Sequence, residues 1–193
     1  MEIRYTPDNE RYKTMTNKEL KDNFTVSNMF EPGKIELVYT DVDRAVVGSV
    51  VPVEESLKLG TYKELAADYF AQRREIGIIN IGGKGSVNID GEEFELNHKD
   101  GLYIGKGSQN ITFASEDSAN PAEFYLLSYP AHKKYPTKLV KKEDAVIAKA
   151  GSNLESNERK IIKYILPGKV ESCQLVMGLT MLSKGNVWNT MSP

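Results

Sequence analysis

The sequence has 193 residues, which is enough for one sizeable domain or two small ones. Its 25 lysines and arginines nearly balance 27 acidic residues, and this argues against the strongly basic surface that nucleic-acid binding requires. One cysteine excludes an intrachain disulfide framework, and the sequence shows neither a secretory signal pattern nor an apolar run of roughly 18 residues. We therefore expect a cytoplasmic protein with no nucleic-acid or membrane partner.

The N-terminal sixty residues predict one short helix and two strands. Thr16 is followed three residues later by Glu, which is the capping-box pattern of a helix start. Short runs of β-branched and aromatic residues then predict strands at Ile35–Tyr39 and Ala45–Val53.

A second helix is predicted after Thr61, which is also followed three residues later by Glu. We expect it to be the better helix, because Leu65, Tyr69 and Phe70 would fall on one face.

The middle of the chain has the pattern of an all-β protein with minor helices. In "GSVNIDGEEFEL" apolar and polar residues alternate on both sides of Asp90-Gly91, which predicts a tight β-hairpin. Further strands are expected at Ile76–Ile81, Leu102–Ile104, Ile111–Phe113 and Phe124–Ser128.

Residues 130–159 are polar and interrupted by proline, which is typical of a connector. Strands resume at "KIIKYIL", and Ser172–Leu182 is expected to form the longest strand. The sequence ends with "NVWNTMSP", Asn186 to Pro193, where a strand-like pattern has only begun.

Short motifs indicate no specific chemistry. "IGGKGS" and "IGKGS" lack the spacing and the following helix of a phosphate-binding loop, and we interpret them as turns. His98 and His132 have no second metal ligand two or four residues away, so we expect turn or surface histidines. Cys173 lies in an apolar alternating pattern and is expected to be a small buried hydrophobe.

Two charged clusters can be compared with catalytic arrangements. Arg73, Arg74 and Glu75 follow the second predicted helix, and a solvated helix end explains them most simply. Glu93 and Glu95 could form a glycosidase-like carboxylate pair, but an outward polar strand face is the simpler interpretation.

Longer stretches carry a family resemblance. They are "YFAQRREIGIINIGGKGSVNIDG", "HKDGLYIGKGS", "PAHKKYPTK", "SNERKIIKYILPGKVESCQLVMGLT" and "KGNVWNTM". Along nearly its whole length the chain resembles the 4-deoxy-L-threo-5-hexosulose-uronate ketol-isomerase family. The resemblance implies two cupin β-barrels of the jelly-roll kind. We expect an N-terminal segment and first cupin at residues 1–130, a polar linker at 131–159, and the opening strands of a second, truncated cupin at 160–193.

The resemblance also implies where metal binds. Glu75 and Gly82 keep the Glu-to-Gly spacing of the cupin motif, but the expected histidine positions hold other residues, so the first barrel is expected to be metal-free. In the family the metal ligands of the second cupin follow the "NTM" stretch, which places them after Pro193. We therefore expect no metal ligand within this chain and one zinc ion per full-length chain.

The same resemblance suggests that the parent chain continues past Pro193. We expect the 193 residues to be a fragment with no isomerase activity of its own. Trp188, Asn189 and Thr190 adjoin the expected ligands and are candidates for the pocket wall, although they are equally well explained as strand-end residues.

The family's reaction is the isomerisation of 5-dehydro-4-deoxy-D-glucuronate to 3-deoxy-D-glycero-2,5-hexodiulosonate, a step in pectin and uronate catabolism. The resemblance implies a zinc-assisted aldose-ketose isomerase, a small uronate substrate, no other cofactor and a homohexamer. Two alternatives stay open: a non-catalytic sugar-binding bicupin, and a deoxyglucuronate isomerase of inositol catabolism. A truncated barrel is also expected to expose apolar edge residues, among them Val176 and Leu182.

Overall fold

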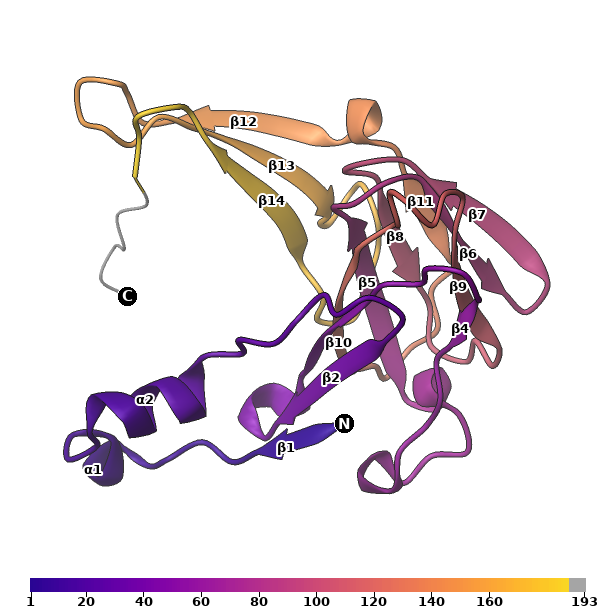
Figure 1. Cartoon of the computed structure of the whole chain (residues 1–193), viewed down its shortest axis with the longest axis horizontal. Helices are drawn as coiled ribbons and strands as arrows, with labels where there is room; N and C mark the ends of the chain where they lie inside the picture. Colours follow the sequence, from indigo (N-terminus) through magenta and orange to yellow (C-terminus); the bar gives the residue numbers. More distant parts are fainter. Residues whose placement is uncertain (188–193) are drawn as a thin grey trace.

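The described part of the chain folds into three β-sheets, with two short α-helices near the N-terminus (Figure 1). The computed structural model describes residues 1–187. The helices are α1 (Asn9–Tyr12) and α2 (Asn17–Phe24). None of the helices in this part of the chain combines the length and the apolar character that a bilayer crossing requires. The all-β class with minor helices is confirmed.

The largest sheet has seven strands in the order β1-β2-β3-β10-β5-β8-β11. Its strands are β1 (Glu2–Arg4), β2 (Ile35–Thr40), β3 (Val46–Val50), β5 (Arg74–Asn80), β8 (Gly101–Ile104), β10 (Phe124–Pro130) and β11 (Lys138–Val140). β1 pairs with β2 in parallel, and the other pairs in this sheet are antiparallel.

Two smaller sheets complete the fold. The four-stranded sheet has the order β4-β9-β6-β7, and the three-stranded sheet has the order β12-β13-β14. Their strands are β4 (Leu57–Lys58), β6 (Gly85–Ile89), β7 (Glu92–Leu96), β9 (Ile111–Ser115), β12 (Val146–Ala150), β13 (Arg159–Ile165) and β14 (Met177–Leu182).

Strand β5 in the middle of the seven-stranded sheet is buried on both faces, and its successive side chains point in opposite directions. On β5, Ile76 and Ile78 belong to a core shared with the four-stranded sheet, which contributes Val87 and Phe113. Ile79 belongs to a second apolar cluster. Strand β5 therefore lies between two cores and carries neighbouring residues into different ones.

The second cluster joins the seven-stranded sheet to the β12–β14 sheet. Its fully buried members include Tyr103 from β8, Tyr164 from β13 and Leu175 from the turn before β14. Figure 1 shows the three-stranded sheet extending away from the two packed sheets. Val146 and Ile147 at the start of β12 and Leu182 at the end of β14 stay exposed.

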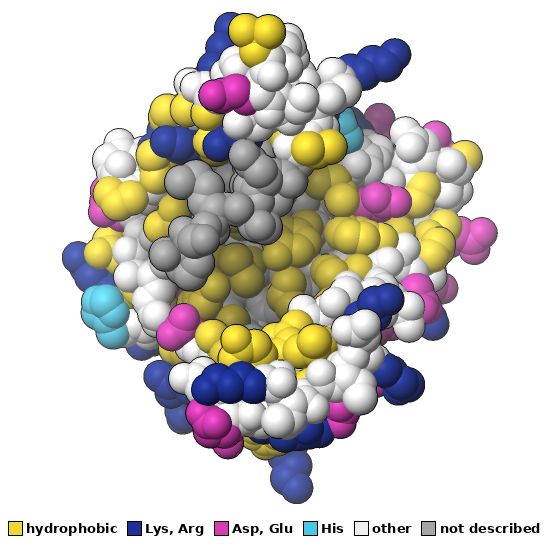
Figure 2. Space-filling view, turned by 90° about the vertical axis from the view of Figure 1, so that its left-hand side faces the viewer, with side chains coloured by type: hydrophobic (Ala, Val, Ile, Leu, Met, Phe, Trp, Pro, Cys, Tyr) yellow, Lys and Arg dark blue, Asp and Glu magenta, His cyan; other side chains and the backbone are white. Residues whose placement is uncertain are grey.

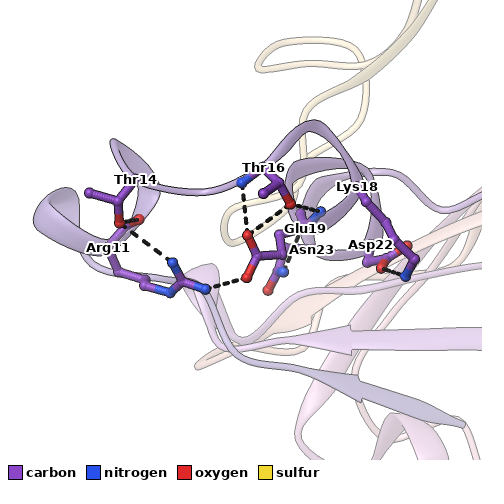
Figure 3. Close-up of polar contacts among 7 residues, drawn as sticks. All are labelled: Arg11, Thr14, Thr16, Lys18, Glu19, Asp22 and Asn23. Carbon is purple, nitrogen blue, oxygen red and sulfur yellow. Dashed lines mark hydrogen bonds and ion pairs between the residues drawn. The ribbon is translucent and has the colours of Figure 1, made fainter.

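Several predicted elements are confirmed. β6 and β7 form the predicted hairpin, and Asp90 and Gly91 both have the positive φ that a tight hairpin turn requires. At the start of α2 the Thr16 hydroxyl accepts from the Glu19 N–H, and the Glu19 carboxylate accepts from the Thr16 N–H (Figure 3). The same carboxylate pairs with Arg11 of α1, which joins the two helices.

The second predicted helix is wrong. Residues Lys63–Leu65 and Phe70–Gln72 form separate 3₁₀ turns, and Ala66 between them has a left-handed φ of 46° that ends the first turn. The Thr61 hydroxyl donates to the Ala67 carbonyl instead of capping a helix. Burial of Phe70 in the first core decides the conformation against the local capping signal.

Residues 131–159, predicted as a polar linker, contain two paired strands. β11 extends the seven-stranded sheet by pairing with β8, and β12 pairs with β13 in the three-stranded sheet. Between them, buried Asp100 accepts from the Lys142 N–H at 2.8 Å and pairs with Lys141 at 3.1 Å. The segment is thus fixed to both sheets, and the proposed domain boundaries remain a prediction.

Candidate functional site

The three candidate pocket-wall residues, Trp188, Asn189 and Thr190, lie outside the described residues, so their role remains a prediction. Pro193 also lies outside them, and the expectation that the metal ligands follow it stays a prediction as well. The structure does describe β14 and the turn that leads toward these residues. The candidate site is therefore built from the contacts that hold β14 at its two ends.

A buried carboxylate fixes the start of β14. Glu75 is fully buried, and its Oε1 accepts from the N–H groups of Gln174 and Leu175 at 2.7 and 2.9 Å. Its Oε2 accepts from the Cys173 N–H and from the Tyr103 hydroxyl, both at 2.8 Å. One side chain of β5 thus binds the whole turn before β14, and all four contacts are donors to the carboxylate.

This contact set overturns two predictions from the sequence. Arg73, Arg74 and Glu75 do not form a solvated helix end, because Arg74 and Glu75 are the first two residues of β5 and are both buried. Ser172–Leu182 is not the longest strand, because β14 begins only at Met177 and the N–H groups of residues 173–175 bind Glu75 instead of a neighbouring strand.

Tyr103 completes the buried contact. Burial raises the pKa of its hydroxyl above the ordinary range, and the hydrogen bond to Glu75 raises it further. The hydroxyl therefore stays protonated and keeps donating to the carboxylate near neutral pH. A phenol and a carboxylate that neighbour each other in a core usually need such a donor–acceptor pairing.

The far end of β14 is fixed to the β12–β13 hairpin. Asn186 Oδ1 accepts from the Glu158 N–H at 2.7 Å, and Asn186 Nδ2 donates to Asn153 Oδ1 at 2.9 Å. The Val187 N–H donates to the Ser156 carbonyl at 2.9 Å. β14 is thus anchored at both ends, immediately before the candidate pocket-wall residues.

An apolar hollow lies on the same side of the molecule. Figure 2 shows hydrophobic side chains on its floor, with the β12–β14 sheet above it and the N-terminal helices below. The second cluster also has apolar members that remain only partly buried, namely Ile81, Tyr125, Leu127, Tyr129, Tyr135, Leu179 and Met181. Val176 and Leu182 are exposed, as expected.

The other candidate residues lie apart from one another. His98 is exposed and its Nδ1 lies 3.1 Å from the Gly82 carbonyl oxygen, and His132 is also exposed. Within residues 1–187 no group of three or more His, Cys, Asp or Glu side chains is placed to hold a metal ion. The prediction for Cys173 is wrong, because it lies partly buried in the turn that binds Glu75, with Sγ 3.4 Å from the Lys133 carbonyl oxygen.

The carboxylates of β7 have the simple role that was expected. Glu93 and Glu95 are both exposed, and Glu95 pairs with Lys84 at 3.3 Å. They lie on the outer face of the four-stranded sheet, and Phe94 between them packs against the first core. The arrangement is a solvated strand face.

Comparison with known proteins shows which family the sequence belongs to. A ketol-isomerase of Lachnoclostridium phytofermentans, 4-deoxy-L-threo-5-hexosulose-uronate ketol-isomerase, is 53% identical over 191 residues, which cover 99% of this chain and 69% of the relative. The enzyme of the same name from Caldicellulosiruptor bescii is 50% identical over the same shares of both chains. Residues 24–193 match the KduI/IolB family. The chain belongs to this family.

Members of the KduI/IolB family include ketol-isomerases, so the chain is a member of an isomerase family. The crystal structure of an IolB-like protein from Salmonella typhimurium LT2 superposes with a TM-score of 0.55 at 14% identity, over 74% of this chain and 54% of that chain. At this identity the likeness concerns the fold alone. The family resemblance read from the sequence is confirmed.

The Glu75 clamp, which is Glu75 with its four donors, is the site feature that sequence reasoning missed. The sequence marks the residue only through its spacing to Gly82, and its partners Cys173, Gln174 and Leu175 lie about a hundred positions later in the sequence. The one usable signal is the position of Glu75 within "EIGII", where an apolar run predicts a strand and a charged residue at its start requires a partner.

Proposed function

We propose that this chain belongs to an enzyme that converts 5-dehydro-4-deoxy-D-glucuronate to 3-deoxy-D-glycero-2,5-hexodiulosonate in pectin and uronate catabolism. The observation that carries the proposal is the identity to named ketol-isomerases over 99% of the chain. In this reaction the proton on the hydroxyl-bearing carbon moves to the neighbouring aldehyde carbon, and the proton of that hydroxyl moves to the aldehyde oxygen, so the aldehyde becomes a hydroxymethyl group and the alcohol becomes a ketone. No atom is gained or lost.

The residues of this chain contribute positioning. Proton transfer between adjacent carbons needs groups held in fixed places, because small displacements cost large factors in rate. Glu75 holds the start of β14 and Asn186 holds the turn after it, so the strand that precedes the candidate pocket-wall residues in the sequence is fixed at both ends. The apolar hollow beside it would keep water away from a reactive enediol.

The proposal includes one zinc ion per full-length chain and no other cofactor. Zinc would supply Lewis-acid polarisation of carbonyl and hydroxyl oxygens. The described residues do not fit such a site, because no three of their His, Cys, Asp or Glu side chains come together to hold a metal ion. We therefore assign no zinc ligand to residues 1–187 and derive no step through the metal.

The remaining parts of the proposal concern partners and location. The substrate is a small uronate, the assembly is a homohexamer, and the compartment is the cytoplasm, with no nucleic-acid or membrane partner. Size-exclusion chromatography with light scattering tests the assembly. A monomer at micromolar concentration would refute the hexamer.

The activity is tested with purified protein whose intact mass is first compared with the 21.6 kDa of 193 residues. The keto-deoxyuronate is incubated in deuterium oxide and followed by proton NMR. We expect the aldehyde hydrate signal to disappear and a hydroxymethyl signal to form. The 5-deoxyglucuronate of inositol catabolism is the comparison substrate, and faster turnover of it, or no turnover of either by zinc-loaded protein of full family length, would refute the proposal.

A further inference from the structure

A positively charged cleft opens beside Arg74 at one end of the first core, on the opposite face of β5 from the Glu75 side chain. It has a volume of about 160 Å³, and its polar lining consists of Tyr39, Arg44, Glu64, Arg73 and Arg74. Three of these side chains are guanidinium groups and one is a carboxylate. Neither the isomerase proposal nor any motif of the sequence gives this cleft a role.

Arg74 is the buried member of the group. Only 6% of the residue is exposed, and no carboxylate of a described residue lies within ion-pair distance of it. Its Nε donates to Ser128 Oγ at 3.1 Å, and its Nη2 donates to the carbonyls of Ser128 and Arg44 at 2.8 and 2.6 Å. Neutral acceptors thus replace the counter-ion that a buried charge normally has.

The third nitrogen of Arg74 faces the cleft. Nη1 has no hydrogen-bond partner among the described residues. Every fully enclosed side-chain nitrogen or oxygen atom of these residues, however, does have a partner. Nη1 must therefore be accessible, and the cleft that Arg74 lines provides the access. Burial lowers the pKa of Arg74 to about 10, so the group is still a cation at neutral pH.

Two further guanidinium groups border the same space. Arg44 and Arg73 are exposed, and neither forms an ion pair with a described residue. Asp43 and Arg44 both have a φ of 51°, a left-handed conformation that is strained for residues other than glycine. This conformation places the Arg44 carbonyl on Arg74, so a strained turn supports the buried cation.

From this geometry we infer that the cleft is a binding site for a small oxyanion, a carboxylate or a phosphate. Arginine presents a planar fork of donors that matches both anions, and hydrogen bonds between ionised groups are stronger than those between neutral groups. Cavities of about 150 Å³ hold one benzene molecule, so this cleft accepts an anionic head group or an anion of a few heavy atoms. Glu64 is the one carboxylate of the lining, and being exposed it leaves the site with an excess of positive charge.

The inference does not depend on the isomerase activity, and it is tested by binding alone. Isothermal titration calorimetry with sodium phosphate and separately with sodium glucuronate, at constant ionic strength, measures the affinity of the purified protein. Arg73→Gln removes an exposed guanidinium, while Lys21→Gln on α2 removes the same charge from an exposed residue that does not line the cleft. Arg74→Lys keeps the buried charge but removes the fork, and circular dichroism checks its folding.

We expect saturable binding of one anion per chain, weakened about fivefold by Arg73→Gln and about tenfold or more by Arg74→Lys, with no change in Lys21→Gln. Binding of phosphate alone identifies a phosphate site, and binding of glucuronate alone identifies a carboxylate site. The inference is overturned if neither anion binds at millimolar concentration, or if Arg73→Gln and Lys21→Gln weaken binding equally. The Arg73 variant decides the question even if Arg74→Lys does not fold.

Discussion

The Glu75 clamp gives the sharpest prediction for stability. Glu75→Ala removes the acceptor of four hydrogen bonds, and two of the donors, the Tyr103 hydroxyl and the Leu175 N–H, belong to residues that are fully buried. Each buried donor that loses its acceptor costs about 1–3 kcal/mol, so the variant should lose about 2–6 kcal/mol of unfolding free energy. The N–H groups of Cys173 and Gln174 belong to partly exposed residues, and water replaces their acceptor more cheaply.

Urea unfolding and amide hydrogen exchange measure this loss. The matched control is Glu93→Ala, because Glu93 is exposed on β7 and should change stability by less than about 0.5 kcal/mol. The exchange rates of the amides at residues 173–175 should rise by at least about tenfold in Glu75→Ala, since about 1.4 kcal/mol corresponds to a factor of ten.

Glu75→Gln separates shape from charge. The variant retains one acceptor oxygen, but its amide NH₂ group faces either the backbone N–H donors or the Tyr103 hydroxyl. We therefore expect an intermediate loss of unfolding free energy of about 1–3 kcal/mol. If Glu75→Ala and Glu93→Ala unfold at the same urea concentration, and the amides at 173–175 exchange alike in both, the clamp does not hold the turn.

Three further outcomes follow from the contacts described above. Asp100→Ala should cost about 2–4 kcal/mol in urea unfolding, because it removes the acceptor of the Asn97 and Lys142 N–H groups and the counter-ion of Lys141, which keeps only its hydrogen bond to the Glu95 carbonyl. A loss no larger than that of exposed Asp144→Ala would contradict this. Burial raises the pKa of Tyr164 to about 12 from an ordinary value of about 10, so its stabilising contribution is complete below about pH 10 and disappears as the pH rises to about 12. Wild-type protein should therefore lose up to roughly 3 kcal/mol more than Tyr164→Phe over that interval, and parallel curves would refute the assignment. Thr16→Ala should increase amide exchange in α2 by an amount that corresponds to about 1 kcal/mol, and unchanged exchange would show that the cap is not stabilising.

Local patterns predict the elements whose partners are close in sequence. The hairpin at Asp90-Gly91 and the capping box at Thr16 each depend on residues a few positions apart, and both are present in the structure. The alternating strands β6 and β9 also follow from the sequence, since Val87 and Ile89 of β6 and Ile111 and Phe113 of β9 all face the first core.

Distant contacts decide the elements that the sequence does not predict. Phe70 enters the core and prevents the helix expected after Thr61. Glu75 binds residues about a hundred positions away and shortens β14. The Arg74 cleft combines residues from separate segments of the chain. The sequence "QRRE" by itself is typical of a solvent-exposed segment and does not indicate a buried arginine. Trp188, Asn189 and Thr190 remain candidates from the resemblance.

The sequence separation of the Glu75 contacts has a consequence for biosynthesis. Its backbone partners are 98 to 100 residues further along the chain, and at about 5–20 residues per second of synthesis they follow Glu75 by roughly 5–20 seconds. The first two sheets can pair during this interval, with Glu75 still hydrated on a face that is otherwise apolar. A carboxylate there opposes premature association of nascent chains, because another chain would have to desolvate it without supplying four donors. We therefore expect the group that holds the finished fold together also to reduce association of unfinished chains on the ribosome.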